Sequence, residues 1–400
     1  MGSAQGSRVK LTVTPGLVRR VWIAWVLLRL VIVAVGLFPR EAGNLADIKT
    51  FHEWTVGYWD HGVVPGRDFD WEYPYGAAPF LLVPLGVRGP WWVYGIIAAE
   101  CLALDAALQG FLLRLGQRRG TALGALLWLL WVPLLGPLLI TRFDLVPAIL
   151  AAGGVALAVT RPRLAGAVLG IAITTKLWPA VLLLLVLVGV QHRRRILEGA
   201  VGGVAGMTAV GAAMGVLPSA LTAVSHQLDR GVQVESLAGL PGLWGAVAGS
   251  APLPEYRHGS WEVTSDVSSV LAVVLFCVGA VLVLLLLRSA RRISVTHLPL
   301  LAAEIMLIVV LTDKVFSPQY LVWVLPLVAV AACRAGAISS LPVVTSFAVL
   351  VLTHLVYPLA YNDLLAGQAL PAALLTGRDA LLIALLVMLH RGRTRSTRSL

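Results

Sequence analysis

The chain has 400 residues, of which 58% are hydrophobic and only 13% are charged, and its mean hydropathy is +0.86. This composition excludes a set of soluble domains and indicates a polytopic membrane protein. The net charge of +11 does not indicate nucleic-acid binding, because the basic residues form short clusters between apolar stretches instead of one patch. A helix that crosses about 30 Å of hydrocarbon needs roughly 20 apolar residues, so we expect an all-α fold of about 12 transmembrane helices, including a short hairpin.

The first apolar run covers residues 21–38 and follows a cluster of four basic residues. The positive-inside rule therefore predicts that the N-terminus is cytoplasmic. The run ends without a small-residue cleavage site, so we expect a retained helix and not a cleaved signal peptide. A first outer loop then covers residues 39–90, of which 76–90 are expected to lie at the outer interface as a short segment broken by proline.

The later apolar runs alternate in direction, so that most basic clusters reach the cytoplasmic side. The expected spans are residues 91–115, 121–140, 143–160, 199–217, 267–288, 296–312, 315–333, 339–358 and 369–389. Residues 164–175 and 177–190 are expected to form a short hairpin with Lys176 at its tip. A long outer loop covers residues 218–265. No linker or internal repeat indicates a second domain, so residues 1–400 are expected to form one integral-membrane domain.

Charge alone permits a second topology. In this alternative, residues 76–87 cross the membrane and residues 164–188 form a single span, which inverts only residues 114–163. Both topologies leave the tail, residues 390–400, in the cytoplasm with the C-terminus, where its arginines are expected to be solvated and to anchor the topology.

A third of the acidic residues lie in the first outer loop. They are Glu41, Asp47, Glu53, Asp60, Asp68, Asp70 and Glu72. Carboxylates accept hydrogen bonds from sugar hydroxyls, and the Trp and Tyr rings between them can cover the apolar face of a sugar. Asp68, Asp70, Glu72 and Tyr73 are therefore candidates for binding a sugar. The alternative is a solvated loop whose tryptophans belong to the interfacial aromatic belt.

Two further outer segments combine charge with an apolar context. Arg142 and Asp144 lie at a turn between two apolar runs, where they could simply pair with each other. Lys176 lies in the middle of an apolar stretch, and because intramembrane lysines are costly and usually functional, we expect it to bind an anion.

The segments Asp229–Ser236 and Thr312–Tyr320 complete the set of polar outer sequences. Ser317-Pro318 is typical of an N-cap followed by proline at the first helical position. Fixed cations and amides in a poorly hydrated site would hold a phosphate, and the candidates for this role are Arg142, Lys176, Arg230, Lys314 and Gln319. Further candidates for binding a sugar or an acceptor are Gln233, Glu235 and Tyr320.

Four charged residues within the predicted spans require partners. Arg29 is expected to pair with Glu100 or Glu304, and Asp105 is also expected to have a structural role. The histidines and cysteines show no spacing typical of metal ligands, so we expect no cofactor, although the sequence leaves a divalent metal open.

These outer segments, in this order, resemble the integral-membrane C-type glycosyltransferases, and in particular glycosyltransferase family 87, which includes polyprenyl-phosphate-mannose-dependent mannosyltransferases. The resemblance covers residues 20–330 approximately. It rests on Asp47, Arg67-Asp68-Phe69 with Glu72-Tyr73-Pro74, Arg142-Phe143-Asp144, Thr175-Lys176 before Pro179, Arg230–Ser236 and Ser317–Tyr320.

The resemblance implies transfer of a sugar from a polyprenyl phosphate to an acceptor hydroxyl with inversion at the anomeric carbon. Mannose is the first candidate for this sugar, and arabinose or another pentose is the alternative. Asp47 matches the family's catalytic carboxylate and is the expected general base, with Asp144 as the second candidate. The family fold favours the first of the two topologies. The expected partners are a polyprenyl-phosphate sugar donor, a membrane-associated acceptor of lipid or glycan type and membrane lipids, with no nucleic acid. We expect a monomer in the plasma membrane with its site on the extracytoplasmic side.

The residues themselves are consistent with such chemistry, because a polyprenyl phosphate leaves as a stabilised anion and one base with several cations suffices. The competing class is a lipid or solute transporter or flippase, which would show inverted repeats and charges near the midplane of the membrane. A non-catalytic assembly subunit is a third possibility, but it leaves the acidic loop unexplained.

Overall fold

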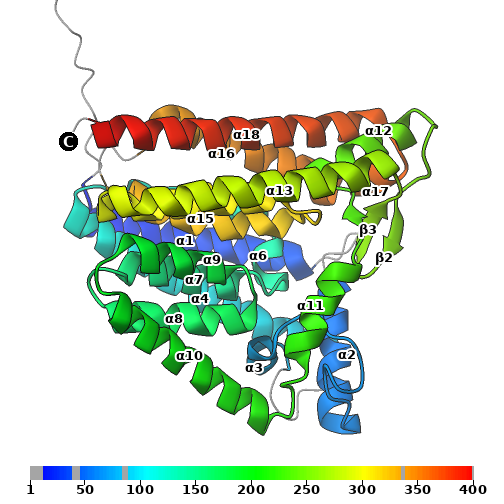
Figure 1. The fold of residues 1–400 in the computed structure, drawn as a ribbon, viewed down its shortest axis with the longest axis horizontal. Coiled ribbons are helices and arrows are strands. Elements are labelled where there is room, and N and C mark those ends of the chain that lie inside the picture. The colour runs from blue at the N-terminus through cyan, green and yellow to red at the C-terminus, as the bar shows by residue number, and fades with distance from the viewer. Residues whose placement is uncertain (1–11, 38–45, 83–88, 335–337, 399–400) are drawn as a thin grey trace, which may run out of the picture.

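The computed structural model describes residues 12–37, 46–82, 89–334 and 338–398. It is 78% helical, and its long helices run side by side in one bundle (Figure 1). In the described ranges, seven helical segments are long and apolar enough to cross a membrane. They contain α1 (Pro15–Leu37), α4 (Pro90–Arg119), α10 (Arg193–Ala213), α13 (Asp266–Ser289), α14 (Leu298–Thr312), α16 (Ser340–His354) and α18 (Ala369–Arg398). The expectation of a polytopic, mainly α-helical membrane protein is confirmed.

Shorter apolar helices fill the interior of the bundle. They are α5 (Leu123–Leu135), α7 (Leu145–Leu157), α8 (Pro162–Thr175), α9 (Pro179–Gly189) and α15 (Leu321–Ala332). In contrast, α13 is covered on few sides, and Val270, Phe276 and Leu284 are exposed along it. An exposed apolar face of this length is suited to lipid and not to water.

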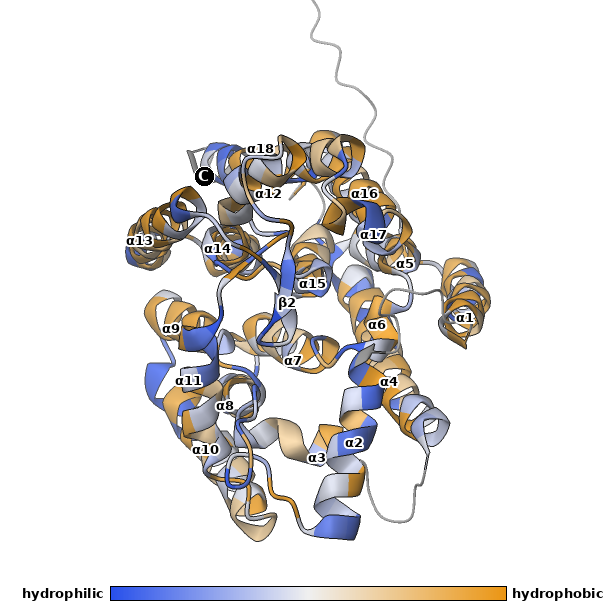
Figure 2. Ribbon diagram, turned by 90° about the vertical axis from the view of Figure 1, so that its right-hand side faces the viewer, coloured by the Kyte–Doolittle hydropathy of each residue, from blue (hydrophilic) through white to orange (hydrophobic). Residues whose placement is uncertain are grey.

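The polar elements lie together at one end of the bundle (Figures 1 and 2). They are α2 (Ala46–His61), α11 (Ser219–Asp229), α17 (Tyr361–Leu365), β1 (Val232–Gln233), β2 (Glu255–Arg257) and β3 (Ser260–Val263). The short α3 (Ala78–Leu81) is apolar. Two further short helices are α6 (Leu138–Thr141) and α12 (Leu240–Val247). The strands form an antiparallel sheet in the order β1-β3-β2, with Tyr256 opposite Trp261. The long outer loop therefore contains a small sheet, which the all-α expectation did not include.

The β2–β3 turn shows why a sheet forms in this loop. His258 and Gly259 both have positive φ, at 46° and 76°, and they connect the paired residues Arg257 and Ser260. A two-residue turn with positive φ at both positions matches the twist of a hairpin, and glycine adopts that geometry without strain.

The predicted hairpin around Lys176 is confirmed. Helix α8 ends at Thr175, α9 begins at Pro179, and the two helices pack against each other. The alternative of a single span over residues 164–188 is therefore wrong. In the segment 76–90, the described part forms only a short 3-10 turn and the four-residue α3, and residues 83–88 lie outside the described residues.

Helices α8 and α10 pack closely, with glycines of each helix against the backbone of the other. A side chain at Gly166 would meet the carbonyl of Ile196, and one at Gly199 would meet the carbonyl of Arg163. Small residues four apart let parallel membrane helices pack backbone against backbone. This contact fixes the hairpin that carries Lys176.

The buried charges pair differently from the prediction. Arg29 binds Asp105, with Nε to Oδ2 at 2.8 Å, and not Glu100 or Glu304. The Trp25 and Trp128 indoles also donate to Asp105. Periodicity did not indicate that α1 would face this part of α4.

The tail is not wholly a solvated anchor. The Arg393 Nε atom lies 2.6 Å from Glu304 Oε1, and Arg393 is only 3% exposed. The expectation for this residue was wrong, because α18 continues as a helix to Arg398 and carries Arg393 back against α14. The start of α1 and the end of α18 lie on the same side of the bundle, opposite the polar end (Figure 1).

Candidate active site

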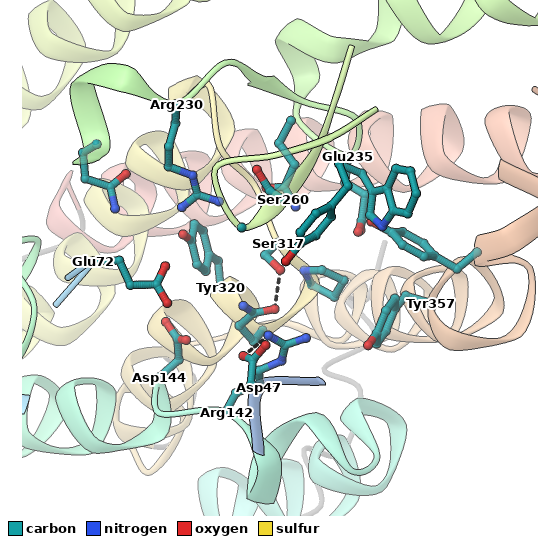
Figure 3. A pocket seen from close by; sticks show the side chains of 18 of the residues that line it. Asp47, Glu72, Arg142, Asp144, Arg230, Glu235, Ser260, Ser317, Tyr320 and Tyr357 are labelled. Carbon is teal, nitrogen blue, oxygen red and sulfur yellow. Dashed lines mark hydrogen bonds and ion pairs between the residues drawn. The ribbon is translucent and has the colours of Figure 1, made fainter. Parts of the chain in front are cut away.

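A cavity of about 360 Å³ opens at the polar end of the bundle. Segments that are far apart in sequence meet around it, and eleven of the fourteen predicted site residues line it (Figure 3). These eleven are Asp47, Glu72, Tyr73, Arg142, Asp144, Lys176, Arg230, Gln233, Glu235, Gln319 and Tyr320. These side chains lie near the ends of helices or in the loops that connect them, at the end of the bundle where the chain reverses direction.

Asp47 lies in the first turn of α2 and binds Arg142, which follows α6 in an extended conformation. Arg142 does not pair with Asp144, so the simple explanation of the 141–144 turn is wrong. The Asp47 side chain is 27% exposed, so its carboxylate is held by one guanidinium and still faces the cavity.

Asp144 is held on one oxygen by two donors. Lys176 Nζ lies 2.6 Å and Trp323 Nε1 lies 2.7 Å from Asp144 Oδ1. The Asp144 side chain is only 3% exposed. Because this carboxylate is buried and occupied, it is suited to fixing Lys176, whereas Asp47 is better placed to accept a proton from a substrate.

Three aromatic rings surround the Lys176 ammonium. Its Nζ lies 5.6 Å from the ring centre of Tyr73, 5.1 Å from that of Tyr320 and 5.2 Å from that of Trp323. Ring faces stabilise a cation without neutralising its charge. Asp144 accepts from one of the three N–H donors of this ammonium, and the rings accept no conventional hydrogen bond, so donors remain for a bound anion.

Arg230 is the second cation of this region. It follows α11, is 9% exposed and has a buried Nε without a hydrogen-bond partner among the described residues. Burial opposes the charge, but the neighbouring Tyr320, Glu72 and Asp313 raise the pKa of Arg230 above its ordinary value. A buried guanidinium with an unused donor indicates a site for an anion.

Glu235 lies deeper in the wall, where it is 1% exposed. Burial raises the pKa of its carboxyl to about 7, and Arg378 opposes this shift. Arg378 Nη1 lies 3.4 Å from Glu235 Oε2, and its Nη2 donates to Asp379 at 2.8 Å. One guanidinium thus serves two carboxylates.

Three predicted site residues do not line the cavity. Asp68 pairs with Arg67 at 2.7 Å, and the hydrogen bond from Arg67 lowers its pKa to about 2. Asp70 is exposed on the same loop. Lys314 donates to the carbonyls of Leu228 and Arg230, so it holds the segment that carries Arg230.

The segment at Ser317 agrees with the sequence only in part. Pro318 begins a 3-10 turn, as predicted for proline at the first position. The Ser317 side chain makes no capping hydrogen bond and instead donates to Gln319 Oε1 (Figure 3). Its hydroxyl therefore orients the Gln319 amide in the cavity.

Several lining residues were not predicted. They include Tyr256, Trp261, Ser260, Tyr357, Tyr361 and Asn362. The sequence offered one signal for the two tyrosines. Tyr357-Pro358 interrupts the apolar run that begins with α16, and the polar Tyr361-Asn362 follows it. Nothing in the sequence indicated that this break would lie beside Asp47.

A second cavity, of about 530 Å³, adjoins the first. Both share Glu72, Lys176, Gln227 and Tyr320 as lining residues. The rest of the second cavity is mostly apolar, and its walls include Leu177, Trp178, Leu228, Ala272, Val273, Phe276 and Val309. Lys176 therefore lies where a polar and an apolar cavity meet. In the described part of the chain, no cluster of His, Cys, Asp and Glu is placed to hold a metal ion.

Fold and site together define a polytopic membrane protein with a charged cavity beside an apolar one. The model of glycosyltransferase family 87 matches residues 73–318, more than half of the chain, so the protein belongs to glycosyltransferase family 87. The predicted resemblance is confirmed at the level of the family, and the protein is a glycosyltransferase. Neither the curated proteins nor the solved structures gave a match to this chain.

Proposed function

We propose that the protein transfers a sugar from a polyprenyl phosphate to a hydroxyl of a lipid- or glycan-type acceptor. Mannose is the first candidate for this sugar. The observation that carries this proposal is the position of Lys176 at the junction of the two cavities. The phosphate would bind at the junction, the isoprenoid chain would fill the apolar cavity, and the sugar would lie in the polar cavity. Few other ligand classes combine these three parts in this order.

The charges at the junction support a phosphate. Lys176 and Arg230 are buried cations close to Tyr320, and both lie near Glu72. Buried cations stabilise a departing phosphate more strongly than solvated ones, because no water competes with them. Arg142 and Gln319 would contact the sugar or the phosphate from the same cavity.

In the proposed reaction, the oxygen of the acceptor hydroxyl forms a bond to the anomeric carbon while the bond from that carbon to the phosphate oxygen breaks. The hydroxyl proton moves to Asp47, and the electron pair of the broken bond leaves with the polyprenyl phosphate. Attack from the face opposite the phosphate inverts the anomeric configuration. General-base assistance of this kind contributes about 10²–10⁴-fold to a rate.

The basic clusters support the side of the membrane that we propose for the cavity. Figure 1 shows the start of α1 and the end of α18 at one end of the bundle and the polar elements at the other end. By the positive-inside rule, the basic residues near both ends of the chain support our proposal that the cavity faces the extracytoplasmic side, and we propose the plasma membrane as its location.

The test uses the full chain reconstituted in vesicles with a polyprenyl-phosphate mannose and extracted envelope glycolipids as acceptors. We expect free polyprenyl phosphate and mannosylated acceptor, detected by mass spectrometry. Movement of the intact donor between leaflets without cleavage would identify a transporter instead and would overturn the proposal.

A further inference from the structure

Three aromatic residues, Trp261, Tyr357 and Tyr361, line the cavity, and we name them the aromatic wall. Figure 3 shows Tyr357 on the side opposite Asp144, which is the ion-pair partner of Lys176. Trp261 comes from β3, and the two tyrosines come from the connection between α16 and α18. Tyr357 leaves helical geometry, with φ −121° and ψ 122°. The two tyrosines lie beyond the residues matched by the family model, which end at 318.

Two polar groups of residues that line the cavity, one on the aromatic wall and one on β1, have no hydrogen-bond partner among the residues that the structure describes. They are the Tyr357 hydroxyl and the Gln233 Oε1 atom. Tyr357 is 6% exposed and Gln233 is 4% exposed, so neither can obtain its hydrogen bond freely from bulk water. Buried polar groups are normally satisfied, and an exception in a cavity indicates that a ligand supplies the partner.

The rings of the wall determine what kind of ligand fits. The ring centres of Tyr357 and Tyr361 lie 5.0 Å apart at an interplanar angle of 80°, so one presents its edge to the other. Aromatic faces cover the C–H faces of a sugar ring, and hydroxyl and amide groups bond its hydroxyls. A plain alkyl alcohol would leave both unpartnered groups unsatisfied.

The position of Asp47 connects this wall to the proposed chemistry. Figure 3 shows the Asp47–Arg142 pair between Tyr357 on one side and Asp144 with Glu72 on the other. An acceptor at the aromatic wall would therefore present a hydroxyl to the proposed base, while the donor occupies the opposite side near Lys176.

We infer that the aromatic wall, with Gln233 and Glu235, is the acceptor subsite and that it selects a saccharide ring as the group that receives the sugar. This inference rests on the proposed function, since it assigns the second substrate of that reaction. It also predicts that Tyr357 determines acceptor specificity through its unpartnered hydroxyl.

The experiment compares two acceptors that share an alkyl chain, n-octyl α-D-mannoside and octane-1,2-diol, in vesicles containing the full-length protein and polyprenyl-phosphate mannose. We expect transfer to the mannoside and little to the diol. Tyr357→Phe should raise KM for the mannoside about tenfold, the equivalent of one hydrogen bond. The Kd for the donor should stay unchanged, because the Tyr357 side chain lines only the other side of the cavity.

Tyr75→Phe is the matched control. It removes the same atom from a tyrosine whose hydroxyl lies 2.9 Å from Thr208 Oγ1 and which does not line the cavity. Its KM for the mannoside should equal that of the wild type. Because the Tyr357 hydroxyl has no hydrogen-bond partner in the described part of the chain, Tyr357→Phe should also unfold at the wild-type temperature.

The experiment distinguishes a failure of the acceptor assignment from a failure of the proposed function. Equal use of the diol, or an unchanged mannoside KM in Tyr357→Phe, would overturn the assignment of the acceptor subsite while leaving a working transferase. Absence of donor cleavage by the wild type with every acceptor tested would overturn the proposed function and, with it, this inference.

Discussion

At the scale of single residues, the two candidate bases differ in how their oxygens are occupied. Asp144 accepts from Lys176 and Trp323 on the same oxygen and is nearly inaccessible. Asp47 is more exposed and has only Arg142 as an ion-pair partner among the described residues. The structure therefore favours Asp47 for proton transfer and Asp144 for holding the cation.

Asp47→Asn tests the role of the base. The amide keeps the shape of the side chain but cannot accept the hydroxyl proton, so we expect kcat to fall by about 10²–10⁴-fold. The Kd for the donor should change little. Asp70→Asn, in the same loop but outside the cavity, should behave like the wild type. Normal turnover by Asp47→Asn would show that another group accepts the proton.

Lys176→Ala tests the phosphate site. Loss of a charge-assisted contact should weaken donor binding by about 10–100-fold, measured as Kd with a non-transferable donor analogue. Lys176→Arg should restore part of this loss, because it keeps the charge. Lys49→Ala, an exposed lysine of α2 outside the cavity, is the control. Donor affinity that survives Lys176→Ala would make the lysine a purely structural partner of Asp144.

At the scale of elements, the α8–α10 contact determines where Lys176 lies. A Cβ atom at Gly199 would meet the Arg163 carbonyl, whereas one at Gly202 would meet nothing within 4 Å. We expect Gly199→Ala to destabilise the protein by about 1–3 kcal/mol, the usual cost of overpacking. Gly202→Ala should be neutral or slightly stabilising, because alanine favours a helix. Equal melting temperatures for the two variants, measured by a thermal shift in detergent, would contradict this packing.

The raised pKa of the Glu235 carboxyl makes the free energy of unfolding depend on pH. Its pKa lies at about 7 in the folded protein and at 4.5 ordinarily, so the folded state binds the extra proton in this interval. Stability should therefore fall as pH rises from about 4.5 to 7 and then level off. Glu235→Gln remains neutral and should remove this part of the pH dependence. Melting curves that fall equally with pH in both proteins would show that Glu235 is already ionised throughout.

At the scale of the whole molecule, the sequence predicted the parts of the fold that depend on local pattern. Hydropathy and basic clusters indicated a polytopic helical membrane protein and the hairpin at Lys176, because a membrane imposes both on the chain. Seven helical segments of the described residues are long enough to cross a membrane, whereas about 12 spans were expected, so the number of spans stays a prediction. Partner choice was not local, so Arg29 was assigned to the wrong carboxylate and Arg393 to solvent. The pairing depends on which helices become neighbours, and no periodicity records that.

Residues of the candidate site were likewise predicted where the signal was local in the sequence and missed where it was not. Charged groups in apolar or aromatic surroundings were conspicuous in the sequence, and most of them line the cavity. Lys314 was equally conspicuous in the sequence, but its ammonium donates hydrogen bonds to two backbone carbonyls. The aromatic wall was missed because tyrosine and tryptophan near a helix end are typical of any membrane interface.

The most direct measurement is a cryo-electron microscopy structure of the protein bound to a polyprenyl-phosphate mannose in which transfer is blocked by Asp47→Asn. We expect the phosphate to contact Lys176 and Arg230, the isoprenoid chain to fill the cavity beside Trp178 and Phe276, and the sugar to face residue 47. A phosphate bound away from Lys176, or a lipid chain outside the apolar cavity, would contradict this expectation.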